Sequence, residues 1–115
     1  MKAITIKIDD QCELVESLWE YQEINNSVGG WIEGVSLGKY GYMFINEEGK
    51  LIGLDINKVA TFLAKNSGNL MSDDYIAGNV VIVGQADDEG NSTDVPERTI
   101  SLLKDMGFIE NEYWK

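Results

Sequence analysis

The chain has 115 residues, and its 20 acidic and 9 basic side chains give a net charge of −11 at pH 7. This length fits a single domain over residues 1–115. The negative electrostatic potential of such a chain repels the phosphate backbones of nucleic acids, so we expect no direct binding to DNA or RNA. No apolar run approaches the roughly 20 residues that cross a bilayer, and a lone cysteine, Cys12, is typical of a reducing compartment, so we expect a cytoplasmic protein with no membrane partner.

The first 30 residues predict two strands and a helix. Alternating isoleucines indicate a half-buried strand over 3–8, and 12–16 could form a second strand. Ser17-Leu18-Trp19-Glu20 matches a capping box, in which a serine side chain accepts a hydrogen bond from the third helical amide. This predicts a helix over 18–28 that ends at Gly29-Gly30. Its apolar face would consist of Leu18, Tyr21, Ile24 and Val28.

The middle of the chain predicts a three-stranded meander and a second helix. Strands are expected over 31–37, 40–46 and 51–53, with turns at 38–39 and 47–50. Asn57 can cap a helix over 58–66, because its side chain can accept a hydrogen bond from an amide of the first turn. This helix is expected to bury Val59, Phe62 and Leu63.

The last third predicts a central strand and a third helix. The run over 79–84 is short, apolar and β-branched, which favours a strand in the middle of a sheet. An acidic loop follows over 87–93, and Asp94-Val95-Pro96-Glu97 repeats the capping pattern for a helix that runs to about Met106, with the proline in its first turn. Together the elements predict a single α+β domain with three helices and a mixed, mostly antiparallel sheet of about five to six strands.

The residue types that most catalytic mechanisms need are missing. The chain has no histidine and one arginine, so it offers no imidazole base, no Ser–His or Cys–His pair and few groups to hold phosphates. Acidic neighbours of Cys12 raise the pKa of its thiol, which disfavours a nucleophile. The carboxylates at 73–74 and 87–89 could hold a divalent cation, but a solvated acidic surface is the simpler interpretation. We therefore expect a non-enzymatic protein without a cofactor or a metal site.

Three segments, taken together, resemble a known family. They read VGGWIE over 28–33, NEEGKLIGL over 46–54 followed by Asn57 and Ala60-Thr61, and DYIAGNVVIVG over 74–84 followed by DDEG at 87–90. The family consists of small domains of unknown function found in phages, plasmids and Gram-positive and actinobacterial genomes. The resemblance therefore implies descent from a mobile element, and it implies no particular reaction. Asp55 departs from the pattern, because the family often has proline there.

Polar residues at the ends of the predicted elements are the candidates for a ligand-binding site. We expect several of Glu33, Asn46, Asn57, Thr61 and Asp74 to converge at one edge of the sheet. There they could fix turns through buried hydrogen bonds. Alternatively, they could line a pocket for a small ligand.

Aromatic residues supply the remaining candidates. Trp31 opens a predicted strand and could pack in the core or offer a platform for a ligand. Tyr113 and Trp114 form an aromatic tail that either docks on the domain or lies open as an interface. A small sheet with such a tail could also leave an edge that a homodimer would cover.

These patterns favour a protein that works by binding. The first hypothesis is a phage or mobile-element accessory protein that sequesters a host protein or a small ligand, in one version to counter host defence. The second is an acidic DNA mimic that inhibits a restriction or CRISPR protein. Its carboxylates would come from Glu13, Glu16, Glu20 and Glu23 near the first helix and from 87–94. The third is a carboxylate-dependent metal enzyme, which the spacing of the acids disfavours.

Overall fold

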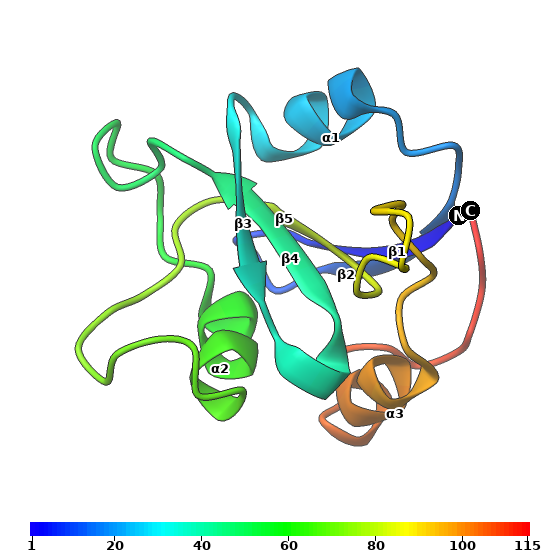
Figure 1. Ribbon diagram of the computed structural model, residues 1–115. Helices are drawn as coiled ribbons and strands as arrows, with labels where there is room; N and C mark the ends of the chain where they lie inside the picture. The colour runs from blue at the N-terminus through cyan, green and yellow to red at the C-terminus, as the bar shows by residue number, and fades with distance from the viewer.

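The computed structural model describes all 115 residues, which form an antiparallel sheet with helices on both faces (Figure 1). The five strands stand in the order β2-β1-β5-β4-β3, and every neighbouring pair is antiparallel. Their bounds are β1 Lys2–Ile6, β2 Cys12–Glu16, β3 Ile32–Ser36, β4 Tyr42–Asn46 and β5 Val80–Val83. The predicted α+β class with three helices is confirmed.

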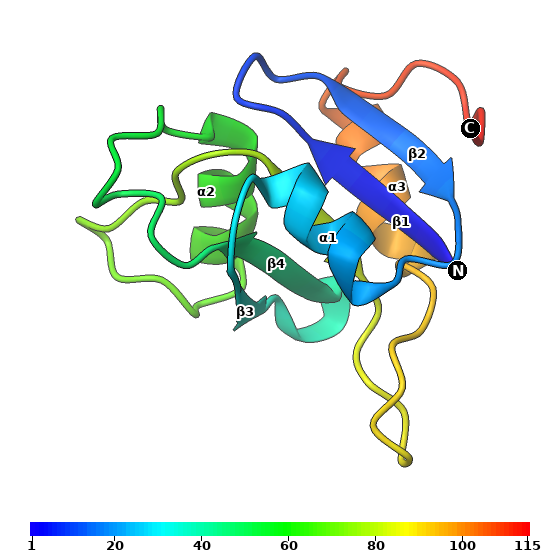
Figure 2. The ribbon, with the colours of Figure 1, turned by 90° about the horizontal axis from the view of Figure 1, so that it is seen from above.

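The three helices divide between the two faces of the sheet. Helix α1 (Tyr21–Val28) covers one face, and α2 (Lys58–Asn66) and α3 (Glu97–Asp105) cover the other, as Figures 1 and 2 show. A short 3-10 turn, η1 (Gly38–Tyr40), joins β3 to β4. None of these helices is long and apolar enough to cross a membrane.

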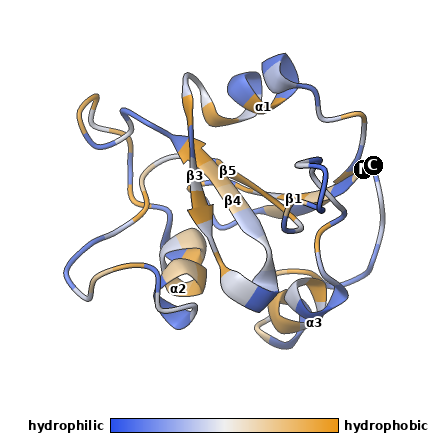
Figure 3. Cartoon of the chain, viewed as in Figure 1, coloured by the Kyte–Doolittle hydropathy of each residue, from blue (hydrophilic) through white to orange (hydrophobic).

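Strand β5 lies at the centre of the sheet and is buried on both faces. Its four residues are at most 1 % exposed. Because successive side chains of a strand point to opposite faces, Val80 and Ile82 join the larger core under α2 and α3, whereas Val81 and Val83 join the smaller core under α1. The predicted central strand is confirmed, and Figure 3 shows hydrophobic residues along this strand and its neighbours.

Helix α1 begins later than predicted, and its capping box does not form. The N-cap is Glu20, which makes no side-chain capping bond, and the Ser17 hydroxyl instead donates to the Glu23 carboxylate at 2.6 Å. The cause is Trp19, whose φ of 52° turns the chain just before the helix. This turn buries the indole, whose N–H donates to the carbonyl of Val15 at 3.2 Å. Burial of one large aromatic side chain has overridden the local capping pattern.

Because α1 starts later than predicted, it buries fewer side chains than predicted. Ile24 and Val28 are buried as predicted, whereas Leu18 precedes the helix and Tyr21 lies at its exposed first position. Gly29 ends the helix in the left-handed conformation, with φ 82°, as predicted. A helix with only two buried side chains suffices here because Trp19 completes the same core.

The predicted strand over 51–53 does not form, and residues 47–53 are consecutive turns. The amide of Ile52 donates to the carbonyl of Glu48, and the amide of Leu54 donates to the carbonyl of Gly49. These local hydrogen bonds occupy backbone groups that a third strand of the meander would use to pair with β4. Leu51 and Ile52 are consequently exposed. Phe62 is exposed too, contrary to prediction, because the buried residues of α2 are those at 59–61, 63 and 64.

The start of α3 differs from the predicted cap. Pro96 is the N-cap residue itself, and no side chain caps the helix. Asp94 instead accepts a hydrogen bond from the Lys2 amide at 2.8 Å, while the Val95 amide donates to the Lys2 carbonyl at 2.9 Å. The segment before α3 is thus fixed to the start of β1. The Asp94 carboxylate, which the sequence pattern predicted as the cap of α3, is used in this long-range hydrogen bond instead.

The C-terminal tail docks along β2 at one edge of the sheet. Trp114 pairs with Leu14, and the Lys115 amide donates to the Leu14 carbonyl at 2.9 Å. Trp114 packs against the larger core, with the Lys2 ammonium 5.1 Å from the centre of its ring. The Lys115 side chain bonds to Glu13, which lowers the pKa of that carboxyl. Of the two aromatic tail residues, Trp114 therefore docks, and Tyr113 stays 73 % exposed.

The two tail aromatics should differ sharply in their effect on stability. We expect Trp114→Ala to lower the free energy of unfolding by about 2 kcal/mol, because it removes apolar area buried against the core. Tyr113→Ala should change it by less than about 0.5 kcal/mol, since that ring is already in water. Urea unfolding followed by circular dichroism measures both. Equal losses for the two variants would contradict docking through Trp114.

Candidate functional site

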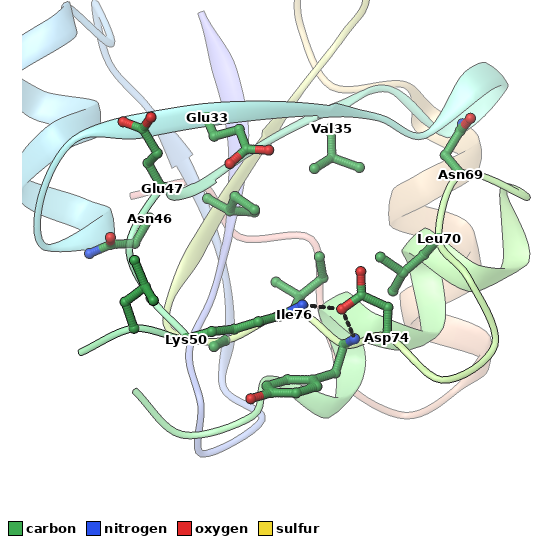
Figure 4. A pocket seen from close by; sticks show the side chains of 14 residues that line it. Glu33, Val35, Asn46, Glu47, Lys50, Asn69, Leu70, Asp74 and Ile76 are labelled. Atoms are coloured by element: carbon green, nitrogen blue, oxygen red, sulfur yellow. Dashed lines mark hydrogen bonds and ion pairs between the residues drawn. The ribbon is translucent and has the colours of Figure 1, made fainter. Parts of the chain in front are cut away.

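A cavity of about 460 Å³ lies at the β3–β4 end of the sheet, on the face that also carries α2 (Figure 4). One wall comes from β3 and β4, and the others come from the 46–51 turn and the 69–77 segment that follows α2. Seven of its 14 lining residues are hydrophobic, so a ligand would find an apolar interior with polar groups at its margins. The lining is Glu33, Val35, Ile45, Asn46, Glu47, Gly49, Lys50, Leu51, Asn69, Leu70, Asp74, Tyr75, Ile76 and Ala77.

The cavity carries a carboxylate that no cation neutralises. Glu33 projects from β3 and turns its carboxylate into the space between the walls, whereas Glu47 points away at the rim (Figure 4). The ion pairs of the protein are Lys7–Glu13, Lys115–Glu13 and Lys50–Asp74, so neither glutamate has a charged partner. An unpaired carboxylate that faces apolar walls, with a second unpaired carboxylate at the rim, favours a cationic ligand group over an anionic one.

The wall opposite Glu33 is fixed by Asp74. Its carboxylate accepts hydrogen bonds from the Lys50 ammonium and from the Tyr75 amide, the latter at 2.8 Å. The bond from Lys50 lowers the pKa of Asp74, and the bond from the Tyr75 amide adds to the effect. Lys50 also lies over the Tyr75 ring, 4.8 Å from its centre. Asp74 therefore joins the turn to the 69–77 segment, and its charge is already satisfied.

Two predicted site residues, Asn57 and Thr61, lie behind the cavity wall instead of in it. Asn57 is fully buried, donates to the carbonyls of Ile6 and Gly78 at 2.9 and 3.0 Å, and caps α2 through the Ala60 amide. The Thr61 hydroxyl accepts a hydrogen bond from the Ile76 amide at 2.9 Å, which holds the 69–77 segment against α2. Both residues fix structure by buried hydrogen bonds, which was one of the two roles predicted for them.

Asn46 borders the cavity but also has a structural task. It is 5 % exposed, its amide group donates to the Val28 carbonyl at 3.2 Å, and its oxygen accepts from the Glu48 amide at 2.9 Å. It thereby ties the end of α1 to the turn after β4. Among the predicted residues, the structure thus brings Glu33, Asn46 and Asp74 to one cavity.

Trp31 lies outside both the core and this cavity. It is 65 % exposed and borders a separate, shallower hollow with the amide side chains Gln22, Asn25 and Asn26. The chain turns at Gly29-Gly30 immediately before it, so the indole faces outward where the strand begins. Of the two roles predicted for Trp31, core packing is therefore wrong.

Several residues that line the cavity carry no pattern that marks them as candidates for a binding site. The sequence pattern places Glu47 and Lys50 only in a turn and Leu70 and Tyr75 in no element, although all four line the cavity. The turn segment that contains Glu47 and Lys50 was among those that carry the family resemblance, which was the available signal. Tyr75 lies in another of these segments and carried the same signal. Leu70 offered none, because its position depends on the long-range bonds of Asp74 and Thr61.

The other acidic groups do not form a second site. No group of three or more Cys, Asp and Glu side chains is placed to hold a metal ion. In the acidic loop, Asp87 accepts bonds from the amides of Glu89 and Asn91, which shape the loop that projects in Figure 2. Glu13 and Glu16 lie on β2, separate from α1, and odd and even positions of a strand face opposite ways. Burial, with help from the Asp10 carboxylate, raises the pKa of Cys12 to about 12.

The comparisons with known proteins identify a family. Residues 1–107 match the model of a family described as Domain of unknown function (DUF3846). No curated protein and no solved structure matches the chain. The match covers most of the chain, including every strand, every helix and the whole cavity lining. The chain therefore belongs to the DUF3846 family of domains of unknown function.

Proposed function

We propose that this protein works by binding, without catalysis, and that its ligand places a positively charged group on an apolar body into the β3–β4 cavity. The observation that carries the proposal is the unpaired Glu33 carboxylate, which points into a cavity lined half by hydrophobic side chains. The ammonium or guanidinium group of the ligand would form an ion pair with Glu33. The apolar part of the ligand would contact Val35, Leu70 and Ile76.

The charge of the whole chain supports a cationic ligand. With a net charge of −11, the protein attracts cations and repels anions at long range. The one lysine of the cavity is bound to Asp74, so no free cation remains there to hold a phosphate or a carboxylate. Nucleotides and other anions are therefore the disfavoured ligand classes.

The biological setting that we propose is an accessory role in a phage or another mobile element. Such a protein would sequester a host factor in the cytoplasm, in one version to counter host defence. The support is the family resemblance of three sequence segments, together with a site that offers binding groups without an imidazole or an activated thiol. The factor would present a basic group, which narrows the search to amines and to basic segments of proteins.

Replacement of Glu33 tests the proposed site. Phenethylamine serves as the probe, with phenethyl alcohol and 3-phenylpropionate as neutral and anionic analogues. Isothermal titration should detect binding of the amine only. Glu33→Gln keeps the side-chain shape and removes its charge. A hydrogen bond to a charged group contributes about 1.5–3 kcal/mol, so the Kd of phenethylamine should rise about tenfold or more.

Glu48→Gln is the matched control. Glu48 is an exposed acid on the adjacent turn that does not line the cavity, and its substitution changes the net charge by the same amount. This variant should bind phenethylamine as the unmodified chain does. Equal weakening in the two variants would show that general charge, and not the cavity, attracts the amine. Tighter binding of 3-phenylpropionate than of phenethylamine would overturn the proposed ligand class.

A further inference from the structure

The sheet has one covered edge and one open edge. At the β2 edge the chain's own tail supplies backbone partners, because the Lys115 amide donates to Leu14 and the Glu16 amide donates to the Lys115 carbonyl. Strand β3 forms the opposite edge, and β4 is its only neighbour in the sheet. An open edge presents unpaired N–H and C=O groups that another extended chain can use.

The hydrogen-bond register shows which groups of β3 face outward. The Trp31 carbonyl accepts from Glu47, and the Leu37 amide donates to Gly41, so the odd-numbered residues of β3 bond to β4. Since bonding alternates along an antiparallel strand, Ile32 and Gly34 direct their amides and carbonyls away from the sheet. The Ser36 carbonyl also points outward, and there it accepts from the Asn69 side chain at 2.8 Å. The open stretch therefore ends at Ser36.

The open stretch borders the cavity. Glu33 and Val35 lie between the outward-facing residues of β3, and both line the cavity on the α2 side of the sheet. In an antiparallel sixth strand, residues opposite Glu33 and Val35 would direct their side chains to this same side. An added strand would thus pair with the backbone of β3 and place alternate side chains beside the cavity.

We propose that β3 accepts an extended segment of a basic protein as an antiparallel sixth strand, with a lysine or arginine of that segment reaching Glu33. The inference rests on the proposed function, because it makes the cationic ligand group part of a peptide. Electrostatic complementarity favours a basic segment in this place, because Glu33 in the cavity and Glu47 at its rim are unpaired and the domain has a net charge of −11. A second copy of the chain would bring two surfaces of like charge together, which disfavours self-pairing. Addition of a strand to an open sheet edge is an established mode of peptide recognition.

A short peptide of alternating valine and arginine, VRVRV with acetylated and amidated ends, tests the proposal. With its central valine opposite Gly34, the valine amides face β3 and the two arginines lie opposite Glu33 and Val35. Isothermal titration should show binding, and the peptide should displace phenethylamine. N-methylation of the central valine removes an amide that bonds to β3, so the Kd should rise about tenfold or more.

N-methylation of the arginine opposite Glu33 is the control, because its amide faces solvent in this register. Its Kd should stay within about threefold of the parent peptide. Equal loss from the two methylations, or no loss from either, would overturn strand addition. If phenethylamine binds but the peptide does not, this inference fails and the proposed function stands. If neither binds, both fail.

Discussion

Asn57→Ala is expected to lower the free energy of unfolding by about 4 kcal/mol. The side chain of Asn57 is fully buried and makes three hydrogen bonds, to the carbonyls of Ile6 and Gly78 and from the amide of Ala60. Alanine would leave the Gly78 carbonyl and the Ala60 amide buried without partners, and it would remove one of the two hydrogen bonds of the Ile6 carbonyl, which also pairs with Val80 in the sheet. The loss combines the cost of the unsatisfied Gly78 carbonyl, about 1–3 kcal/mol, and of the bond lost at Ile6, about 1 kcal/mol, with the loss of a helix cap, about 1 kcal/mol.

Asn66→Ala is the matched control for this prediction. Asn66 is an exposed residue at the last position of the same helix. Its replacement should change the free energy of unfolding by less than about 0.5 kcal/mol. Urea unfolding at neutral pH, followed by tryptophan fluorescence, measures both variants. A cost below about 1 kcal/mol for Asn57→Ala would contradict its role as the joint between β1, α2 and the segment before β5.

Gly41→Ala should destabilise the domain by a similar amount, about 4 kcal/mol. Gly41 precedes β4 with φ 115° and ψ −153°, a region that is essentially restricted to glycine. A Cβ atom built there would lie 2.2 Å from the carbonyl oxygen of Val83. That carbonyl belongs to the central strand, so relief of the contact would require β4 and β5 to move apart.

Gly38→Ala separates the two causes of this loss. Gly38 also has a positive φ, 59°, but a Cβ atom there would meet nothing within 4 Å. Only the cost of the left-handed backbone remains, and we expect a loss of about 1 kcal/mol. Thermal and urea unfolding of the two variants give the comparison. Equal stability of Gly41→Ala and Gly38→Ala would show that the contact with Val83 is relieved at no cost.

The elements that the sequence predicts correctly are those with strong local signals. The β-branched run of β5 and the Asn57 cap of α2 each combine composition and boundary residues that agree. The wrong predictions lie where a distant contact overrides a local pattern. Trp19 turns toward the smaller core, so the helix predicted from residue 18 with Ser17 as its cap cannot form there, and Asp94 bonds to Lys2 on β1 instead of capping α3.

Only part of the candidate site was predicted from the sequence, because distant contacts also decide which polar side chains reach the cavity. Glu33 and Asp74 were expected at one edge of the sheet, and both line the cavity. Asn57 and Thr61 share the polarity of those residues, but sequence alone could not separate a polar side chain that faces a cavity from one that bonds to buried backbone. That difference depends on where the 69–77 segment folds back, which Thr61 fixes through Ile76. Trp31 is exposed because the chain turns at Gly29-Gly30 immediately before it, and a β-strand pattern alone does not reveal that turn's effect on the indole.

The most direct test of the account is an amide chemical-shift map of the ¹⁵N-labelled protein titrated with phenethylamine. We predict that the largest shifts fall on Glu33, Val35, Leu70 and Tyr75, and that Glu33→Gln strongly reduces them at a subsaturating amine concentration. Shifts centred on Trp31 and the amide side chains around it, or none at saturating amine, would contradict a cation-binding site beneath β3.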